Sequence, residues 1–185
     1  MNFLKVIETV TSQLDTEGVR YSLIGGFAMA LRGVQRSTID LDFILMLEDL
    51  EKADDIFQKC GYTRAFRSEN VSHYISDELE LGRIDILHAF RGPTLGMIEQ
   101  SDRIEVANGY TLPVVKIEGI IGLKVQALVN DPKRATSDWS DIRIMLETCS
   151  EADQIVDWDL LKDYLDLFQL GSKLPELRDW YGTTE

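Results

Sequence analysis

The chain has 185 residues, of which 44% are hydrophobic and 28% are charged, and its formal net charge is −13. This length and composition are typical of a globular protein that buries its own core in one domain, with room for a small helical appendage. A protein that holds nucleic acid along an extended surface normally has a basic face, because phosphate neutralisation supplies most of that affinity. The strong negative charge therefore argues against extended DNA binding.

The sequence also argues against a membrane or secreted protein. No apolar run approaches the roughly 20 residues that cross a bilayer, and residues 1–18 alternate apolar and charged residues at helical spacing, unlike a signal peptide. Cys60 and Cys149 have no metal-type spacing, so we expect reduced thiols in a cytoplasmic protein. His73 and His88 lack a carboxylate or cysteine at ligand spacing, and we interpret both as structural.

The N-terminal part of the chain alternates predicted helices and strands. Helical periodicity, alternation and glycine stop signals delimit each element. In chain order we expect a helix over 3–17, a strand within 19–26, a short helix within 26–33, a strand over 38–47, a helix over 48–60, and short extended pieces at 61–66, 72–76 and 82–90.

The C-terminal part changes from strands to helices. Asn108-Gly109 stands between alternating residues and predicts a tight hairpin turn. Helical periodicity follows in 117–130, 137–149 and 157–169. We therefore predict an α/β (α+β) domain over 1–115, and a helical C-terminal segment over 116–185 that packs on it.

Two carboxylates stand inside the predicted strand "TIDLDFILML". Because side chains alternate along a strand, one face is apolar and expected in the core, with Ile39, Leu41, Phe43 and Leu45. Asp40 and Asp42 share the other face. Adjacent like charges repel, more so as water is removed, so the pair needs a hydrated face, a shared proton or a bound cation.

Asp85 repeats the pattern in "GRIDILHAF", where it stands between two isoleucines that face the other way. Mg²⁺ commonly uses one or two carboxylates together with substrate phosphates. A third carboxylate on a neighbouring strand would complete a two-metal site for in-line phosphoryl displacement, and Asp85 could accept the proton of the attacking hydroxyl. An exposed strand with a solvated acidic face is the simpler interpretation of Asp-x-Asp alone.

The stretch "LIGG" ends a strand and opens a helix. Gly25 and Gly26 can adopt backbone angles closed to other residues, and the N–H groups that follow can meet an anion. An ordinary tight turn explains the pair equally well. Arg36, just before the carboxylate strand, could add a charge-assisted contact to phosphate, although an isolated arginine is more often a surface residue.

Together these features resemble the nucleotidyltransferase superfamily that includes DNA polymerase beta. The form "IGGFAMALRGVQRSTIDLDFIL" is similar to its small bacterial members, among them minimal nucleotidyltransferases and AbiEii-type proteins of toxin–antitoxin systems. It is also similar to certain aminoglycoside and lincosamide nucleotidyltransferases. The resemblance covers residues 20–90 and extends more loosely to about 150. It implies a mixed central sheet flanked by helices.

Carried over to this chain, the resemblance implies that Gly25 and Gly26 hold the triphosphate. It places two Mg²⁺ ions on Asp40 and Asp42 and assigns Asp85 to the third carboxylate position. Much of the superfamily has Gly-Ser at the turn, where the serine hydroxyl touches phosphate. This chain has Gly26 instead, and we expect main-chain N–H groups to substitute.

Lys124 falls on the apolar side of the helix predicted in "KIEGIIGLKVQALVN". Its stem could pack while its ammonium reaches water, or it could reach toward a triphosphate or a carboxylate. In the following segment Ser137 could cap a surface helix with Asp138 in its first turn. The resemblance makes Asp138 and Asp141 partners for Lys124 instead.

We therefore predict a Mg²⁺-dependent nucleotidyltransferase that moves a nucleoside monophosphate from a nucleoside triphosphate such as ATP to a hydroxyl and releases pyrophosphate. The acceptor stays open among a protein, an RNA end and a small molecule, and the resemblance permits a toxin–antitoxin role with a partner protein. The alternative is a non-catalytic antitoxin-like module that binds nucleotide or a partner toxin. A third interpretation is an α/β protein whose aspartates line a hydrated groove. The presence of all three aspartates favours the enzyme.

Overall fold

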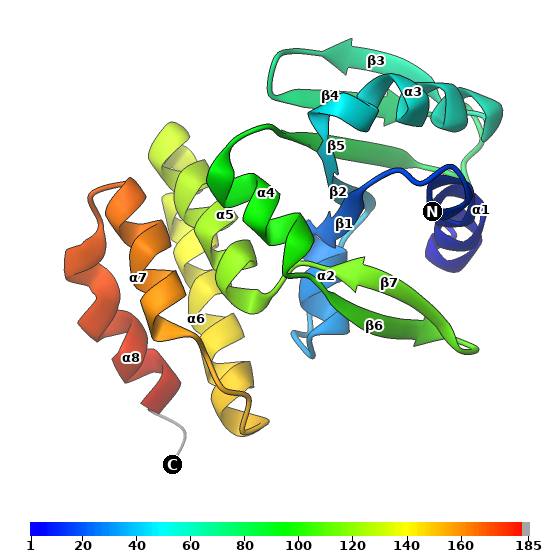
Figure 1. The fold of residues 1–185 in the computed structure, drawn as a ribbon. Helices are drawn as coiled ribbons and strands as arrows, with labels where there is room; N and C mark the ends of the chain where they lie inside the picture. The colour runs from blue at the N-terminus through cyan, green and yellow to red at the C-terminus, as the bar shows by residue number, and fades with distance from the viewer. Residues whose placement is uncertain (183–185) are drawn as a thin grey trace. The chain divides into compact units, whose positions relative to one another are not determined.

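A computed structural model describes residues 1–182, and the chain divides into two compact units (Figure 1). The first unit consists of residues 1–31 and 35–115, and the second of residues 32–34 and the chain from Lys116 onward. No helix within the described residues is both long enough and apolar enough to span a membrane. Cys60 and Cys149 are free thiols, as expected.

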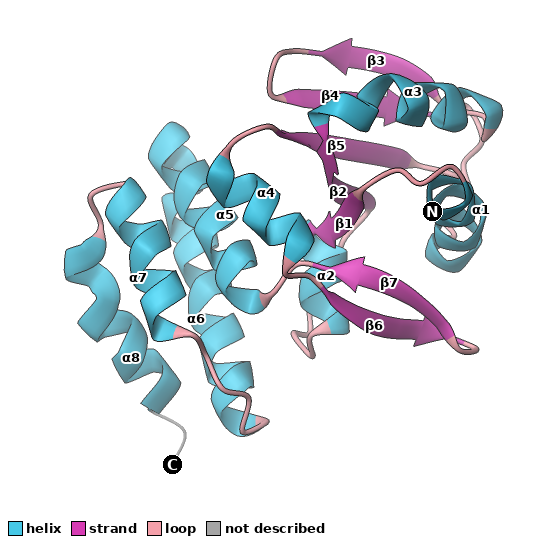
Figure 2. Cartoon of the chain, viewed as in Figure 1, coloured by secondary structure: helices cyan, strands magenta, loops and turns pink. Residues whose placement is uncertain are grey.

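The first unit is a sheet with helices (Figure 2). A one-turn 3₁₀ helix, Leu47–Asp49, leads into the helix that begins at Leu50. The elements are α1 (Phe3–Thr16), β1 (Tyr21–Ile24), α2 (Gly25–Leu31), β2 (Asp40–Met46), α3 (Leu50–Lys59), β3 (Thr63–Arg67), β4 (Val71–Ile75), β5 (Arg83–Ala89), α4 (Gly92–Glu99), β6 (Asp102–Ala107) and β7 (Tyr110–Val114).

The strands form one mixed sheet in the order β3-β4-β5-β2-β1-β7-β6. β2 runs parallel to β5, β1 runs parallel to β7, and the other neighbours are antiparallel. The β2–β5 register sets Asp42 opposite Asp85 and Leu41 opposite Ile84. The mixed sheet predicted from the resemblance is therefore confirmed.

One face of the sheet carries the core and is covered by α1 and α3. The Tyr21 ring meets Phe43 edge-on, and its hydroxyl donates to Asp15 of α1 at 3.1 Å. On the same face, Phe57 of α3 packs against Tyr74, with ring centroids 4.5 Å apart. The fully buried apolar residues on this face of β2 and β5 are Leu41, Phe43, Leu45, Ile84 and Ile86.

The expectation that Ile39 joins this core is wrong. Its side chain is 84% exposed, because β2 begins at Asp40 and Ile39 belongs to the loop before it. The opposite face of the sheet is covered in part by α4, which lies against β1 and β2. Ser101, just after α4, donates to Ser22 of β1 at 2.8 Å. The remainder of that face carries the aspartates.

The predicted hairpin is confirmed between β6 and β7. Asn108 and Gly109 have φ angles of 52° and 78°, which is the left-handed geometry that a two-residue turn of this kind needs. Helix α4 was not predicted. Its sequence, "GPTLGMIE", holds two glycines and a proline, which are poor helix formers, so its packing on the sheet must stabilise it.

The second unit is helical. Its helices are α5 (Ile117–Asn130), α6 (Ala135–Glu151), α7 (Trp158–Leu167) and α8 (Leu174–Gly182), with 3₁₀ turns at Pro132–Arg134 and Gly171–Lys173. The three predicted helices are confirmed, and α8 was not predicted. α5 packs on α6 and α7, and α6 packs on α8. Close approach of α5 and α7 requires Gly122, because a Cβ there would lie 2.9 Å from the Tyr164 ring.

Candidate active site

Three carboxylates meet on the face of the sheet opposite the core. Asp40 and Asp42 come from β2, and Asp85 comes from the adjacent parallel strand β5, in register with Asp42. One carboxylate oxygen of each residue lies within 4.8 Å of those of the other two, and all three residues are half-buried. Three hard oxygen donors at this spacing suit a divalent cation such as Mg²⁺.

The carboxylates of this triad are poorly neutralised. Burial, with the charges of Asp40 and Asp85, raises the pKa of Asp42 from 3.8 to about 7. The N–H of Gly26 and the charge of Arg83 act in the opposite direction on the same pKa, but less strongly. Among the described residues, one arginine, Arg83, forms an ion pair with the triad, through Asp85. Three carboxylates therefore share one guanidinium. A bound cation would relieve the repulsion.

The two glycines make room for these carboxylates. Gly25 has a φ of +69°, and a Cβ there would lie 2.0 Å from Asp42 Oδ2. A Cβ on Gly26 would lie 2.9 Å from Thr38 Cβ. Thr38 in turn donates its hydroxyl to Asp40 Oδ1 at 3.0 Å. The Gly-Gly pair therefore has a steric role beside β2, in addition to the phosphate role predicted for it.

Asp85 is held by two nitrogen donors on the same oxygen. Arg83 Nε lies 2.6 Å and His73 Nδ1 lies 2.7 Å from Asp85 Oδ1. The interpretation of His73 as a residue without a carboxylate partner is wrong, because β4 and β5 pair antiparallel with His73 opposite Asp85. The contact crosses strands, and spacing within one strand could not find it. His88 is structural as expected, buried and 2.8 Å from Ser72 Oγ.

Arg36 lies in the loop before β2, on the protein surface. Its Nη1 is 3.5 Å from the sulfur of Met29 in α2. Both residues belong to the first unit, so the structure brings Arg36 next to α2, the helix that begins at Gly25. A contact of Arg36 with phosphate stays a prediction.

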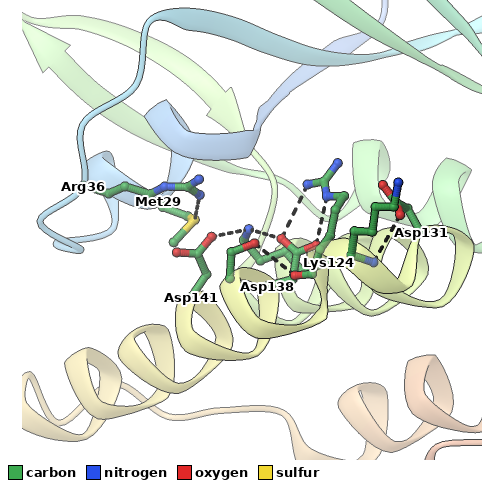
Figure 3. A network of polar contacts seen from close by, with 9 residues as sticks. Met29, Arg36, Lys124, Asp131, Asp138 and Asp141 are labelled. Carbon is green, nitrogen blue, oxygen red and sulfur yellow. Dashed lines mark hydrogen bonds and ion pairs between the residues drawn. The ribbon is translucent and has the colours of Figure 1, made fainter.

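Lys124 lies within the second unit, in an ion-pair network (Figure 3). Its Nζ is 3.0 Å from Asp138 Oδ1 and 2.5 Å from Asp141 Oδ2. Arg134 Nε lies 3.1 Å from the other oxygen of Asp138. Lys124 is 8% exposed, so the interpretation that its ammonium reaches water is wrong.

The prediction of a surface helix capped by Ser137 is also wrong. α6 begins at Ala135, and the Ser137 hydroxyl donates back to the Arg134 carbonyl at 2.9 Å, which is no N-cap contact. Asp138 is 2% exposed rather than on the surface. The pairing of Lys124 with Asp138 and Asp141 is confirmed.

Comparison with known proteins gives structural matches alone. No protein-family model matches the chain, and no curated protein matches its sequence. The solution structure of the antibiotic-resistance factor ANT(2″)-Ia matches with a TM-score of 0.65 and 16% identity, covering 98% of this chain and 99% of that one. A crystal structure of ANT(2″)-Ia in complex with adenylyl-2″-tobramycin matches with a TM-score of 0.64 and 15% identity, over 91% and 99%.

An antigenic nucleotidyltransferase-like protein from Paracoccidioides brasiliensis matches with a TM-score of 0.61 and 16% identity, covering 98% of this chain and 92% of that one. At such identities the likeness concerns the fold. The chain has a nucleotidyltransferase fold.

Proposed function

We propose that this protein is a Mg²⁺-dependent nucleotidyltransferase. The observation that carries the proposal is the triad of Asp40, Asp42 and Asp85, whose oxygens converge within 4.8 Å and which, among residues 1–182, pairs with one arginine, Arg83. An acceptor hydroxyl attacks the α-phosphorus of a nucleoside triphosphate. The new P–O bond forms as the bond to the bridging oxygen breaks, and pyrophosphate leaves with that electron pair.

The donor set fits two Mg²⁺ ions, because carboxylate oxygens are the ligands this ion takes in proteins. When bound, the ions neutralise triphosphate charge and lower the pKa of the acceptor hydroxyl. Asp40 and Asp42 would hold both ions. Asp85 would hold the ion on the acceptor side and take the hydroxyl proton on Oδ2, because Oδ1 already accepts from two nitrogens.

The triphosphate would be held by main-chain N–H groups at Gly25 and Gly26, which lie beside Asp42 and Thr38, and by the guanidinium of Arg36. A contact of Lys124 with phosphate stays a prediction. To bind phosphate it would exchange one of its contacts with Asp138 and Asp141 for a phosphate oxygen. These four roles rest on the resemblance and on residue chemistry.

We propose a small-molecule hydroxyl as the preferred acceptor, ahead of a protein side chain or an RNA end. The fold extends over nearly the whole length of ANT(2″)-Ia, which was crystallised with an adenylylated aminoglycoside. A net charge of −13 favours encounter with a cationic acceptor over a polyanion. A toxin–antitoxin role and a cytoplasmic location stay predictions.

The test is incubation of the purified protein with each α-labelled nucleoside triphosphate, Mg²⁺ and either an aminoglycoside panel or a cell extract. The Asp40→Asn, Asp42→Asn double variant runs beside it. Label on a small molecule with the wild type alone supports the proposal, and label on RNA or protein changes the acceptor class. Absence of label from folded wild type, with nucleotide still bound, would favour the non-catalytic binding module.

A further inference from the structure

We propose that His73 is a positioning residue that fixes the Asp85 carboxylate, so that Asp85 Oδ2 stays available to metal and acceptor. The inference rests on the proposed function and concerns a residue to which the proposed chemistry assigns no role. It follows from strand register, hydrogen bonding and ring stacking around one imidazole.

The register places His73 in a row of side chains that crosses four strands. Phe66 of β3 is opposite His73 of β4, His73 is opposite Asp85 of β5, and Asp85 is opposite Asp42 of β2. Directly opposed residues point to the same face of a sheet. The imidazole therefore stands between an aromatic ring and the carboxylate triad.

The distance between His73 and Asp85 indicates that Nδ1 of His73 carries a proton. Nδ1 lies 2.7 Å from Asp85 Oδ1, and two acceptors would repel at this distance, so Nδ1–H donates to the carboxylate. Arg83 Nη2 lies 3.2 Å from the same nitrogen, but a guanidinium also only donates, so that approach is no hydrogen bond in this tautomer. Arg83 instead donates through Nε to Asp85 Oδ1 at 2.6 Å.

Two donors on one oxygen restrict rotation of the carboxylate. With Oδ1 held from both sides, Oδ2 keeps its lone pairs for a ligand, and its direction is set by the bonds at Oδ1. Groups that hydrogen-bond a metal ligand in this manner typically change metal affinity by about 10-fold to 100-fold when they are removed.

Phe66 fixes the plane of the imidazole. The two rings are stacked, with centroids 5.3 Å apart and an interplanar angle of 24°. Phe66 is 50% exposed, so core burial does not explain its presence on β3. Stacking against His73 does explain it, because the Phe66 ring limits tilting of the imidazole plane, and the Nδ1–H bond to Asp85 sets which edge of the ring faces the carboxylate.

The experiment measures Mn²⁺ binding to the full chain by electron paramagnetic resonance, using Mn²⁺ alone as the probe. His73→Phe keeps a ring for Phe66 but removes the donor, and His73→Asn restores a donor. His88→Asn is the matched control, because it breaks the Ser72 contact of the same two strands on the opposite face. Asp42→Asn reports whether binding occurs at the triad.

We expect His73→Phe to weaken Mn²⁺ affinity by about 10-fold or more. We expect His73→Asn to recover most of that loss, and His88→Asn to lower the melting temperature with Mn²⁺ affinity unchanged. Wild-type affinity in His73→Phe, or an equal loss in His88→Asn, would overturn the inference and leave the proposed function standing. Equal Mn²⁺ binding by wild type and Asp42→Asn would overturn both.

Discussion

Each unit of the molecule holds a cluster of carboxylates, and the two clusters are treated in opposite ways. In the second unit, Asp138 and Asp141 share the ammonium of Lys124, and Arg134 adds a second cation. In the first unit, the three carboxylates of the triad on β2 and β5 pair with one arginine of the described residues, Arg83. Asp138 and Lys124 are buried, and the three residues of the triad are half-buried.

The difference concerns charge balance: the Lys124 network is matched by cations within the fold, and the triad is the cluster that the proposed function assigns to a metal ion. Buried carboxylates with matched cations need no further partner, and they hold α5 to α6. The triad keeps an uncompensated repulsion, seen in the raised pKa of Asp42. A cation bound from solution would remove this repulsion. Strongly perturbed pKa values are common at functional sites for this reason.

The largest effect is expected from removing one charge of the triad. Asp42→Asn keeps the shape of the side chain but removes a metal ligand, so nucleotidyl transfer should fall by at least about 10³-fold. The measurement is transfer of α-labelled nucleotide, with circular dichroism to confirm the fold. Asp55→Asn, at an exposed position of α3 in the same unit, should leave turnover unchanged. Wild-type transfer by Asp42→Asn would contradict the proposed metal site.

Disruption of the Lys124 network should lower the stability of the protein. Lys124→Met leaves Asp138 buried beside Asp141 without the shared ammonium, so the free energy of unfolding should fall by about 3 to 5 kcal/mol in urea denaturation. Lys162→Met removes an exposed ion pair with Asp166 and should change that free energy by less than about 1 kcal/mol. Equal effects of the two substitutions would show that the Lys124 network is no buried ion pair.

The glycine turn offers a matched pair of substitutions. Gly25→Ala introduces a Cβ that would lie 2.0 Å from Asp42 Oδ2, and Gly18→Ala introduces one with no atom within 4 Å, at nearly the same φ (+69° and +67°). Both should lose about 1 to 3 kcal/mol of stability through backbone strain. Gly25→Ala alone should also lower kcat/KM, by about 10²-fold, because the carboxylate is displaced. Unchanged turnover in Gly25→Ala would contradict the steric role of the turn.

The smallest effect concerns the stability of the metal-free protein. The folded pKa of Asp42, about 7, lies above its unfolded value of 3.8, so the folded state binds more protons between these values. The free energy of unfolding in a chelator should therefore fall as pH rises from about 4 to about 7. Asp42→Asn should remove this slope and stabilise the metal-free protein at pH 7.5 by about 1 to 2 kcal/mol. A variant as pH-dependent as wild type would contradict the raised pKa.

The carboxylate strand could be predicted because it depends on local pattern. Alternation in residues 38–47 separates Asp40 and Asp42 from the apolar face, and the helical stripe of α5 places Lys124 on its buried side. Strand ends follow weaker signals. Ile39 continues the alternation in the sequence, yet it lies outside β2 and is exposed.

Contacts that depend on register could not be predicted in this way. The His73–Asp85 pair requires the alignment of β4 with β5, and the turn between them at 76–82 has no signature that fixes its length. Helices α4 and α8 contain proline and glycine, so tertiary packing, not propensity, determines them.

The most direct test of the difference between the two clusters is anomalous diffraction from crystals soaked in Mn²⁺. Anomalous density among Asp40, Asp42 and Asp85, and none beside Asp138 and Asp141, is the predicted result. Absence of density at the triad, or density at the Lys124 network instead, would contradict the assignment of the triad as the cation site.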